Sequence, residues 1–506
     1  MSDQPVVKTS QGSVRGVWRE LGSGESGRPG MFARSAAFLG IPFAEPPVGA
    51  RRFAAPVPHR PWPGVRDATA YGPTAQRRPL AEVTAIPEPS LPGDSTLNVN
   101  VFTPAPGDTA ARLPVLVWIH GGGYKGGSPA SPWYDGAAFN RDGVVTVTLS
   151  YRLGFDGFGW IADAPQNRGL LDQIEALRWV RRNVAAFGGD PGRVTIAGQS
   201  AGGGSVIALL SSPLAHGLFH AAISQSGALR PATTEAARAV GRRVAALAGV
   251  PCTRAGLAAL TEDELLDLQE VVEREQDTAT GTLDDAVRRL VDGGGFSLPF
   301  APWLDGEVLV DPPVEAFRAG VGAGVPLLMG ATAHEFDGAA DQFAPLVAGI
   351  DLESSLASSM GACAQTYLAG TRDQPGGPAG QLAHLWTTML FRVPMLRWAS
   401  ARGDAPTWLY DFRYRPGGDG LALHCSELPF TWDALGAERA AASVGEDPPQ
   451  QLADAMHGAW VEFIRTHAAP WRAWDDGTSV AMVFADRSEA RPAFALERAL
   501  ARALPA

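Results

Sequence analysis

The residues best suited to chemistry form the pentapeptide GQSAG at positions 198–202, in which Ser200 stands between two glycines. A short apolar run at 193–197 precedes it, and a segment typical of a helix start follows at 206–210. A G-x-S-x-G sequence between a strand and a helix predicts a sharp turn that exposes the serine hydroxyl. The alternative is a glycine-rich turn whose serine only caps the helix. The flanking elements favour Ser200 as the nucleophile of an acyl transfer.

A second glycine-rich segment, HGGGY at positions 120–124, follows the apolar run at 115–119. Its glycines allow backbone N–H groups to approach a developing negative oxygen, which is the arrangement of an oxyanion hole. A phosphate-binding loop is the alternative, but such a loop would place Gly-Lys-Ser or Gly-Lys-Thr at a helix start, and residues 123–126 read GYKG. We expect the loop and the N–H of Ala201 to bind the oxyanion, with His120 supporting the loop.

A serine nucleophile needs a general base, and chain order restricts the choice among nine histidines. Hydrolases with this kind of turn run serine, acid, histidine along the chain, with the histidine in a loop after a late strand. His424 meets this condition, because it lies in the loop at 417–429 beyond a strand-like segment at 407–410. His384 and His457 lie in helical stretches, where packing or surface roles are more common. We therefore expect His424 to be the base.

The supporting carboxylate is expected after an earlier strand. The apolar segment at 326–329 runs into a loop that carries both Glu335 and Asp337. Either carboxylate would orient the imidazole and stabilise its cation, as the third member of a triad does. The chemistry of the residues leaves the two nearly equal.

The elements around these residues predict an α/β fold. From residue 113 onward, short apolar runs alternate with helical patterns, which is typical of a sheet built from parallel crossovers. The expected strands are 115–119, 144–149, 194–197, 221–224, 326–329, 407–410 and 482–485, with a crossover helix at 167–187. The first hundred residues carry extended segments at 6–14 and 34–39, which predict an antiparallel edge and a surface wrap.

Two later segments, 233–277 and 351–402, look mainly helical, the second with a break at 370–380. Strand-like segments resume after each, so we interpret them as insertions. We expect one α/β domain over residues 1–506, with a large, mostly parallel mixed sheet flanked by helices and with helical insertions around 233–300 and 340–402.

Composition and charge exclude several function classes. The 506 residues are 45% hydrophobic and 19% charged, and no apolar run approaches the roughly 18 residues of a membrane span. A net charge of −11 without a basic patch argues against nucleic acid as a partner. The three cysteines lack the number and spacing of a disulfide framework or a zinc site. With no secretory signal visible, we expect a cytoplasmic protein that uses no metal and no organic cofactor.

These motifs together resemble the type-B carboxylesterase family, which includes para-nitrobenzyl esterases, cholinesterases and some carbamate hydrolases. The resemblance covers nearly the whole chain. Beside the serine pentapeptide, it shows in FLGIPFAEPP (38–47), WPGVRD (62–67), residues 97–104, NRGLLDQ (167–173) and FGGDP (187–191). It implies an α/β-hydrolase fold and a serine hydrolase that cleaves carboxylic esters.

The resemblance also implies roles for single residues. It identifies Glu335, five residues after Gly330, as the acid in preference to Asp337. The segment HCSELPF at 424–430 matches the family's histidine segment, which supports His424 as the base.

The implied oxyanion donors are Gly122, Gly123 and Ala201. Ser226 corresponds to a serine that supports the acid, and a simple strand-end turn is the alternative for this residue. Gln199 occupies the position before the serine where many members have glutamate, so one negative charge beside the nucleophile is missing.

Two departures from the family bear on compartment and substrate. Thr74 and Thr96 stand where secreted members carry a disulfide, which agrees with a cytoplasmic location. No tryptophan lies between Trp62 and Trp118, the region that holds the choline-stacking indole of cholinesterases, so a cationic choline ester is not expected.

The sequence thus predicts hydrolysis of a small-molecule ester through an acyl-enzyme intermediate. A carbamate or activated-amide hydrolase with the same triad is one alternative. A non-catalytic adhesion or scaffold protein is another, because the family includes neuroligin-like members that have lost the triad. The physiological ester stays open, as does the choice between monomer and homodimer, and the sequence assigns no function to Lys125, Trp303 or Cys425.

Overall fold

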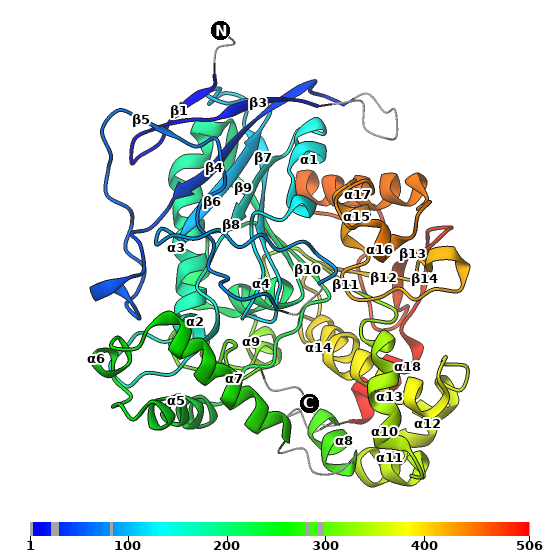
Figure 1. Cartoon of the computed structure of the whole chain (residues 1–506). Coiled ribbons are helices and arrows are strands. Elements are labelled where there is room, and N and C mark those ends of the chain that lie inside the picture. Colours follow the sequence, from blue (N-terminus) through cyan, green and yellow to red (C-terminus); the bar gives the residue numbers. More distant parts are fainter. Residues whose placement is uncertain (1–3, 22–29, 81–83, 279–282, 292–297, 505–506) are drawn as a thin grey trace.

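A large twisted sheet forms the centre of the molecule. The computed structural model describes residues 4–21, 30–80, 84–278, 283–291 and 298–504. Within them an eleven-stranded sheet has the order β14-β13-β12-β11-β10-β9-β7-β8-β6-β4-β3 (Figure 1). Its strands are β3 (Val17–Glu20), β4 (Arg34–Pro42), β6 (Asn98–Thr103), β7 (Leu113–Ile119), β8 (Val145–Leu149), β9 (Gly189–Gln199), β10 (Ala221–Gln225), β11 (Leu327–Thr332), β12 (Thr407–Phe412), β13 (Val480–Phe484) and β14 (Glu489–Pro492).

The sheet is mixed and mostly parallel, as the sequence predicts. The neighbouring strands from β8 through β7, β9, β10, β11 and β12 to β13 pair in parallel. At one edge β3, β4 and β6 pair antiparallel, and β14 does so at the other. Every residue of β8, β10, β11 and β12 is buried, because helices cover both faces of the sheet.

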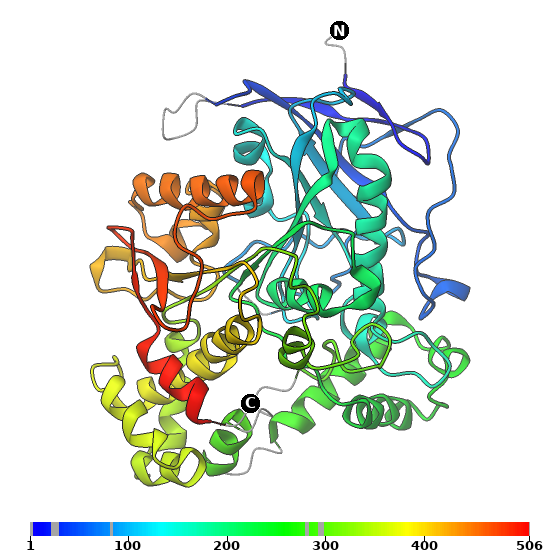
Figure 2. The same ribbon diagram turned by 180° about the vertical axis from the view of Figure 1, so that it is seen from behind.

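Alternate side chains of a strand enter two separate cores. In β7 the odd-numbered residues from 115 to 119 pack with α3 (Arg168–Asn183) and α4 (Ala201–Ser211). Leu116 and Trp118 instead pack with α17 (Gln450–Thr466). Figure 2 shows α3 and α17 on opposite sides of the strands. The parallel strands therefore end between two helical layers, at the edge where the predicted site residues lie.

The N-terminal segment differs from the single extended stretch that the sequence predicts. It forms a tight hairpin of β1 (Val6–Lys8) and β2 (Ser13–Arg15), which joins β5 (Val65–Asp67) in a separate three-stranded sheet. The N–H and the hydroxyl of Thr9 both donate to the carbonyl oxygen of Gly12, over 2.9 and 2.7 Å. These bonds close a turn that reverses the chain within the segment.

Helical segments follow β10 and β11 and lie at the end of the molecule away from β1 (Figure 1). Their helices are α5 (Thr234–Ala248), α6 (Arg254–Leu257), α7 (Glu262–Thr278), α8 (Leu283–Val291), α10 (Ala340–Val347), α11 (Leu352–Met360), α12 (Cys363–Gly370), α13 (Gly377–Thr387) and α14 (Val393–Ala401). The predicted break falls between α12 and α13. A hydrophobic cluster joins α8, α11, α12 and α13 to the C-terminal helix α18 (Ala495–Ala503).

The remaining α-helices of the described residues are short. They are α1 (Ala137–Arg141), α2 (Gly154–Phe158), α9 (Pro313–Arg318), α15 (Leu428–Thr431) and α16 (Ala441–Val444). Among the described helices, none combines the length and the apolar character needed to cross a bilayer. In the same residues no group of three or more His, Cys, Asp or Glu side chains is arranged to hold a metal ion.

Candidate active site

Ser200 lies at a sharp turn between β9 and α4. Its backbone has φ 58° and ψ −123°, a conformation that a residue with a side chain rarely adopts. A Cβ on Gly202 would lie 2.0 Å from the carbonyl oxygen of Ile119, and one on Gly198 would lie 2.5 Å from the backbone of α4, so glycine is required at both positions. The N–H of Ser200 donates to the carbonyl oxygen of Gln225 over 2.9 Å. The end of β10 therefore holds the turn in place.

Glu335 and His424 meet on the loops that follow β11 and β12. Oε2 of Glu335 lies 2.5 Å from Nδ1 of His424. Oε1 accepts from the N–H of Thr332 over 2.8 Å, and the carbonyl oxygen of Glu335 accepts from the N–H of His424 over 3.0 Å. Glu335 is buried. These bonds fix both the carboxylate and the imidazole ring.

Asp337, the other carboxylate on the loop after β11, contacts a different histidine. Its Oδ2 lies 2.9 Å from Nδ1 of His384, which is buried on α13. Its Oδ1 accepts from the hydroxyl of Thr387 over 2.6 Å. From the chemistry of the residues alone, Glu335 and Asp337 are nearly equal candidates for the carboxylate beside the base. The structure places Glu335, and not Asp337, in contact with His424, as the family resemblance implies.

Aromatic rings enclose the imidazole of His424. Ring centroids lie 5.4 Å away for Phe336 and 5.1 Å away for Phe391. Phe391 is part of a π-helical turn, Thr388–Arg392, between α13 and α14. Turns of this kind insert a residue into a helix and occur often at functional sites. Sequence reasoning missed both rings, since no local pattern signals a π-helical turn.

The pKa of His424 is raised well above the ordinary value of an imidazole. Burial acts against the charged ring, but the carboxylate of Glu335, in contact with Nδ1, favours the charge and outweighs burial. Burial also raises the pKa of the Cys425 thiol, which therefore stays protonated at neutral pH. A ring of raised pKa takes a proton from a serine hydroxyl more readily.

The second nitrogen of His424 faces the turn that carries Ser200. The side-chain amide nitrogen of Gln199 lies 3.2 Å from this Nε2 atom. In the described part of the chain, no hydrogen bond joins the Ser200 hydroxyl to His424. Gln199 is buried, so its contact with the ring is shielded from water.

The glycine-rich loop after β7 passes beside Ser200. A Cβ on Gly121 would lie 3.1 Å from Cβ of Ser200. Gly122 and Gly123 follow with φ of 107° and 59°. Among the described residues, neither their N–H groups nor that of Ala201, the first residue of α4, donates to an acceptor. Free donors at this place are the elements of an oxyanion hole.

His120 supports this loop. Its Nδ1 lies 2.8 Å from the carbonyl oxygen of Gly121, and its ring stacks on Tyr151 with centroids 4.6 Å apart. Burial lowers the pKa of His120 to about 4, so the ring is neutral at physiological pH. Its Nδ1 donates a hydrogen bond to the loop, so we assign His120 a structural role and not that of the catalytic base.

Ser226 and Trp303 take packing positions. The N–H of Ser226, at the end of β10, donates to the carbonyl oxygen of Gly330 over 2.8 Å. The Ser226 hydroxyl is buried and has no hydrogen-bond partner within the described residues. Trp303 is buried in the core, where its indole N–H donates to the carbonyl oxygen of Phe158 over 3.0 Å.

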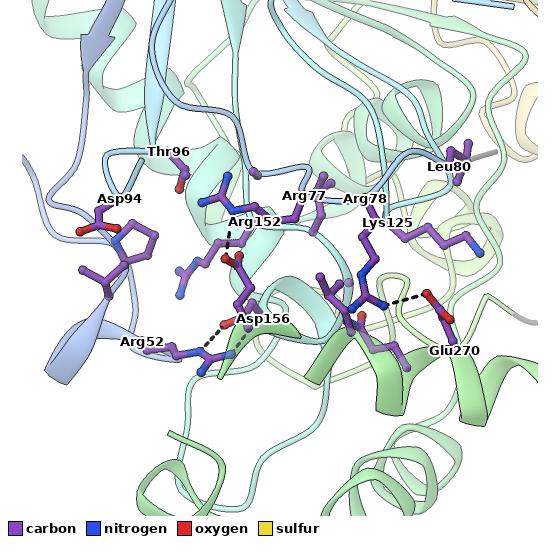
Figure 3. A pocket seen from close by; sticks show the side chains of 18 of the residues that line it. Arg52, Arg77, Arg78, Leu80, Asp94, Thr96, Lys125, Arg152, Asp156 and Glu270 are labelled. Carbon is purple, nitrogen blue, oxygen red and sulfur yellow. Dashed lines mark hydrogen bonds and ion pairs between the residues drawn. The ribbon is translucent and has the colours of Figure 1, made fainter. Parts of the chain in front are cut away.

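A cavity of about 570 Å³ lies beside Lys125, the residue that follows the glycine-rich loop (Figure 3). Neither Ser200 nor His424 lines it. Its walls carry ion pairs: Arg52–Asp156 at 3.0 Å, Arg78–Glu270 at 2.9 Å and Lys125–Glu273 at 2.8 Å. Because these cations are already paired with acids, Lys125 is not a free binding group for an anionic substrate.

Comparison with known proteins gives this geometry its context. The model of the carboxylesterase family matches residues 3–478. The chain belongs to this family. It is 36% identical over 466 residues to the para-nitrobenzyl esterase of Bacillus subtilis, covering 88% of this chain and 90% of that protein. It is 35% identical over 474 residues to liver carboxylesterase 1 of Mus musculus, covering 85% of this chain and 80% of the relative.

Solved structures agree with the family assignment. A PNB esterase structure superposes with a TM-score of 0.80 at 32% identity and covers 100% of both chains. A carboxylesterase of Geobacillus stearothermophilus has a TM-score of 0.78 at 33% identity and covers 98% of this chain and 100% of its own. The predicted α/β-hydrolase fold is confirmed. The protein is a carboxylesterase, a serine hydrolase that acts on small carboxylic esters.

Proposed function

We propose that Ser200 is the nucleophile of this carboxylesterase, His424 its general base and Glu335 the supporting acid. Two contacts carry the proposal: the 2.5 Å contact between Glu335 and Nδ1 of His424, and the 3.2 Å contact of Nε2 on the other side of the ring with Gln199, the residue before Ser200. His424 takes the serine proton as Ser200 attacks the ester carbonyl, and it protonates the leaving alcohol. Water then repeats the two steps on the acyl-enzyme and releases the acid.

The oxyanion of each tetrahedral intermediate is proposed to bind the N–H groups of Gly122, Gly123 and Ala201. Each of these donors contributes about 3 to 4 kcal/mol of transition-state stabilisation. Ser226 contributes through its backbone, because its N–H bond to Gly330 ties β10 to the strand that leads to Glu335. No metal and no organic cofactor takes part in the mechanism.

The proposed substrates are esters with an aromatic alcohol group. Two observations support this choice: the rings of Phe336 and Phe391 beside His424, and the para-nitrobenzyl esterase among the relatives. A carbamate has the same shape but a less reactive carbonyl. Turnover of an aryl ester compared with that of the matching aryl carbamate separates the two classes, and a preference for the carbamate would contradict the proposal.

We also propose that the chain works in the cytoplasm as one domain. Its three cysteines, Cys252, Cys363 and Cys425, are all free thiols, as a reducing compartment requires. The insertion helix α14 packs against α9, which in turn packs against α4 behind the Ser200 turn. Such contacts join the insertions to the core of the sheet.

Release of p-nitrophenol from short acyl esters by wild type and Ser200→Ala tests the nucleophile, with rates measured from about pH 7 to 9 because the base must be unprotonated to act. We expect activity to fall by about 10⁵-fold or more in the variant. A fluorophosphonate probe should label wild type and not the variant, and an unchanged thermal melt of the variant would separate loss of the nucleophile from loss of folding. A variant as active as wild type would overturn the proposal.

A further inference from the structure

Gln199 contacts both parts of the proposed machinery. Its side-chain nitrogen lies 3.2 Å from Nε2 of His424. Its side-chain oxygen is turned toward the oxyanion loop, where a Cβ on Gly121 would lie 3.1 Å from it, and it has no hydrogen-bond partner among the described residues. Gln199 is 1% exposed. The side chain therefore spans the space between base and oxyanion loop with one end unpaired.

The position of the hydrogen on Nδ1 of His424 determines whether Nε2 donates or accepts a hydrogen bond. Because Nδ1 donates to Glu335, Nε2 of the neutral ring carries a lone pair and accepts a hydrogen bond. The amide of Gln199 supplies the donor. The hydroxyl of Ser200 needs the same lone pair in order to pass its proton to the base, and within the described residues it has no hydrogen bond to the ring. Gln199 and Ser200 thus compete for one acceptor atom.

Several titratable groups face the ring beside Gln199. Glu335 lies on the loop after β11, while Cys425 and Glu427 lie on the loop of His424 itself. Burial and the nearby Glu335 raise the pKa of Glu427 to about 7. These groups are unchanged when residue 199 alone is replaced, so a comparison of variants at this position isolates its own effect.

We propose that Gln199 is a positioning residue of the esterase, whose amide holds Nε2 of His424 in the resting enzyme and yields that nitrogen to Ser200 when an ester binds. The inference rests on the proposed function, since it assumes that His424 is the base for Ser200. No covalent bond forms on Gln199. The serine proton moves to Nε2 at the moment when Ser200 replaces the amide as its hydrogen-bond partner.

The charge at position 199 then controls the protonation state of the base. Gln199→Glu replaces the amide donor with a carboxylate, which has no hydrogen to offer a neutral Nε2 and instead accepts from the protonated ring. A negative charge at this distance raises the pKa of an imidazole by about one to three units. Gln199→Met keeps the length of the side chain and adds neither a donor nor a charge.

The test is the pH dependence of kcat/KM for p-nitrophenyl acetate in wild type, Gln199→Glu and Gln199→Met. We expect the acid limb of Gln199→Glu to move upward by about one to three pH units, with activity recovered at higher pH. Gln199→Met should move the limb by less than half as much. A limb that stays in place in Gln199→Glu, or moves downward, overturns the inference.

Gln173→Glu provides a matched control. Gln173 is also buried, and its amide donates to the hydroxyl of Ser205 on α4 over 3.0 Å. The same substitution there should leave the acid limb in place, and an equal shift in both variants would overturn the need for a direct contact. If Ser200→Ala is inactive while Gln199→Glu leaves the acid limb unchanged, only the role of Gln199 is wrong. If Ser200→Ala is active, the proposed function itself is wrong.

Discussion

Two carboxylate–histidine pairs share one loop of this esterase. In one, Oε2 of Glu335 lies 2.5 Å from Nδ1 of His424; in the other, Oδ2 of Asp337 lies 2.9 Å from Nδ1 of His384. The histidine side chains are 18% and 9% exposed, so both rings are largely desolvated. A hydrogen bond between a buried carboxylate and an imidazole is therefore not what distinguishes a base.

The two pairs differ in the contacts that their remaining polar atoms make. Nε2 of His424 faces the turn of Ser200, whereas the second oxygen of Asp337 accepts from Thr387 on the same helix as His384. The Asp337 pair therefore ties the loop to the insertion helix α13. An oriented imidazole becomes a base only where its other nitrogen meets a nucleophile, and elsewhere the same bond stabilises the fold.

Among the substitutions that test the difference between the two pairs, Glu335→Gln should have the largest effect on activity. An amide cannot hold Nδ1–H as the carboxylate does, so the ring loses its orientation and its cation loses a counter-charge. We expect kcat to fall by about 10⁴-fold with little change in folding. Initial rates with p-nitrophenyl acetate, beside a thermal melt, measure this. A loss of less than about tenfold would contradict the role assigned to Glu335.

The pH dependence of kcat/KM also distinguishes the two pairs, because only the titration of the histidine that acts as base should affect the rate. The base must be unprotonated, and the pKa of His424 is raised above the ordinary 6.5. Activity should therefore increase with pH through a midpoint above 6.5 and fall by about tenfold per pH unit below it. Measurement of kcat/KM from about pH 5 to 9 at constant ionic strength tests this sign. A midpoint below 6.5 is the contrary outcome.

Asp337→Asn should act on stability and spare catalysis. The variant weakens buried hydrogen bonds to His384 and Thr387, which we expect to lower the free energy of unfolding by about 1 to 3 kcal/mol. Activity of the folded enzyme should stay within about threefold of wild type. Denaturant unfolding and steady-state rates measure the two effects. If Asp337→Asn reduced kcat as much as Glu335→Gln, the distinction between the pairs would fail.

Ser226→Ala should have the smallest effect. The substitution removes a hydroxyl that has no partner within the described residues and keeps the backbone bond to Gly330. We expect stability to change by less than about 0.5 kcal/mol and kcat by less than about twofold. The same rate and unfolding assays apply. A large loss of kcat would mean that the hydroxyl supports Glu335 during the reaction, as the family resemblance implies.

The parallel strands and β4 (Arg34–Pro42) of the antiparallel edge could be predicted from the sequence, whereas β14 at the opposite edge could not. Every expected apolar run overlaps a strand, because a strand buried on both faces needs a continuous apolar sequence. All residues of β14 (Glu489–Pro492) are exposed, so no hydrophobic pattern marks it. The first residues of β9, from Gly189 to Gly192, were missed for a similar reason, since glycine, proline and polar residues predict a turn.

The sequence by itself determined the local parts of the site. The Ser200 turn and the glycine-rich loop depend on a few consecutive residues and on steric limits that only glycine meets. The tertiary structure decided which carboxylate meets which histidine and which side chain occupies Nε2 of His424. These partners lie 89 and 225 residues apart in the chain, and contacts over such separations depend on the packing of the whole sheet and its insertions.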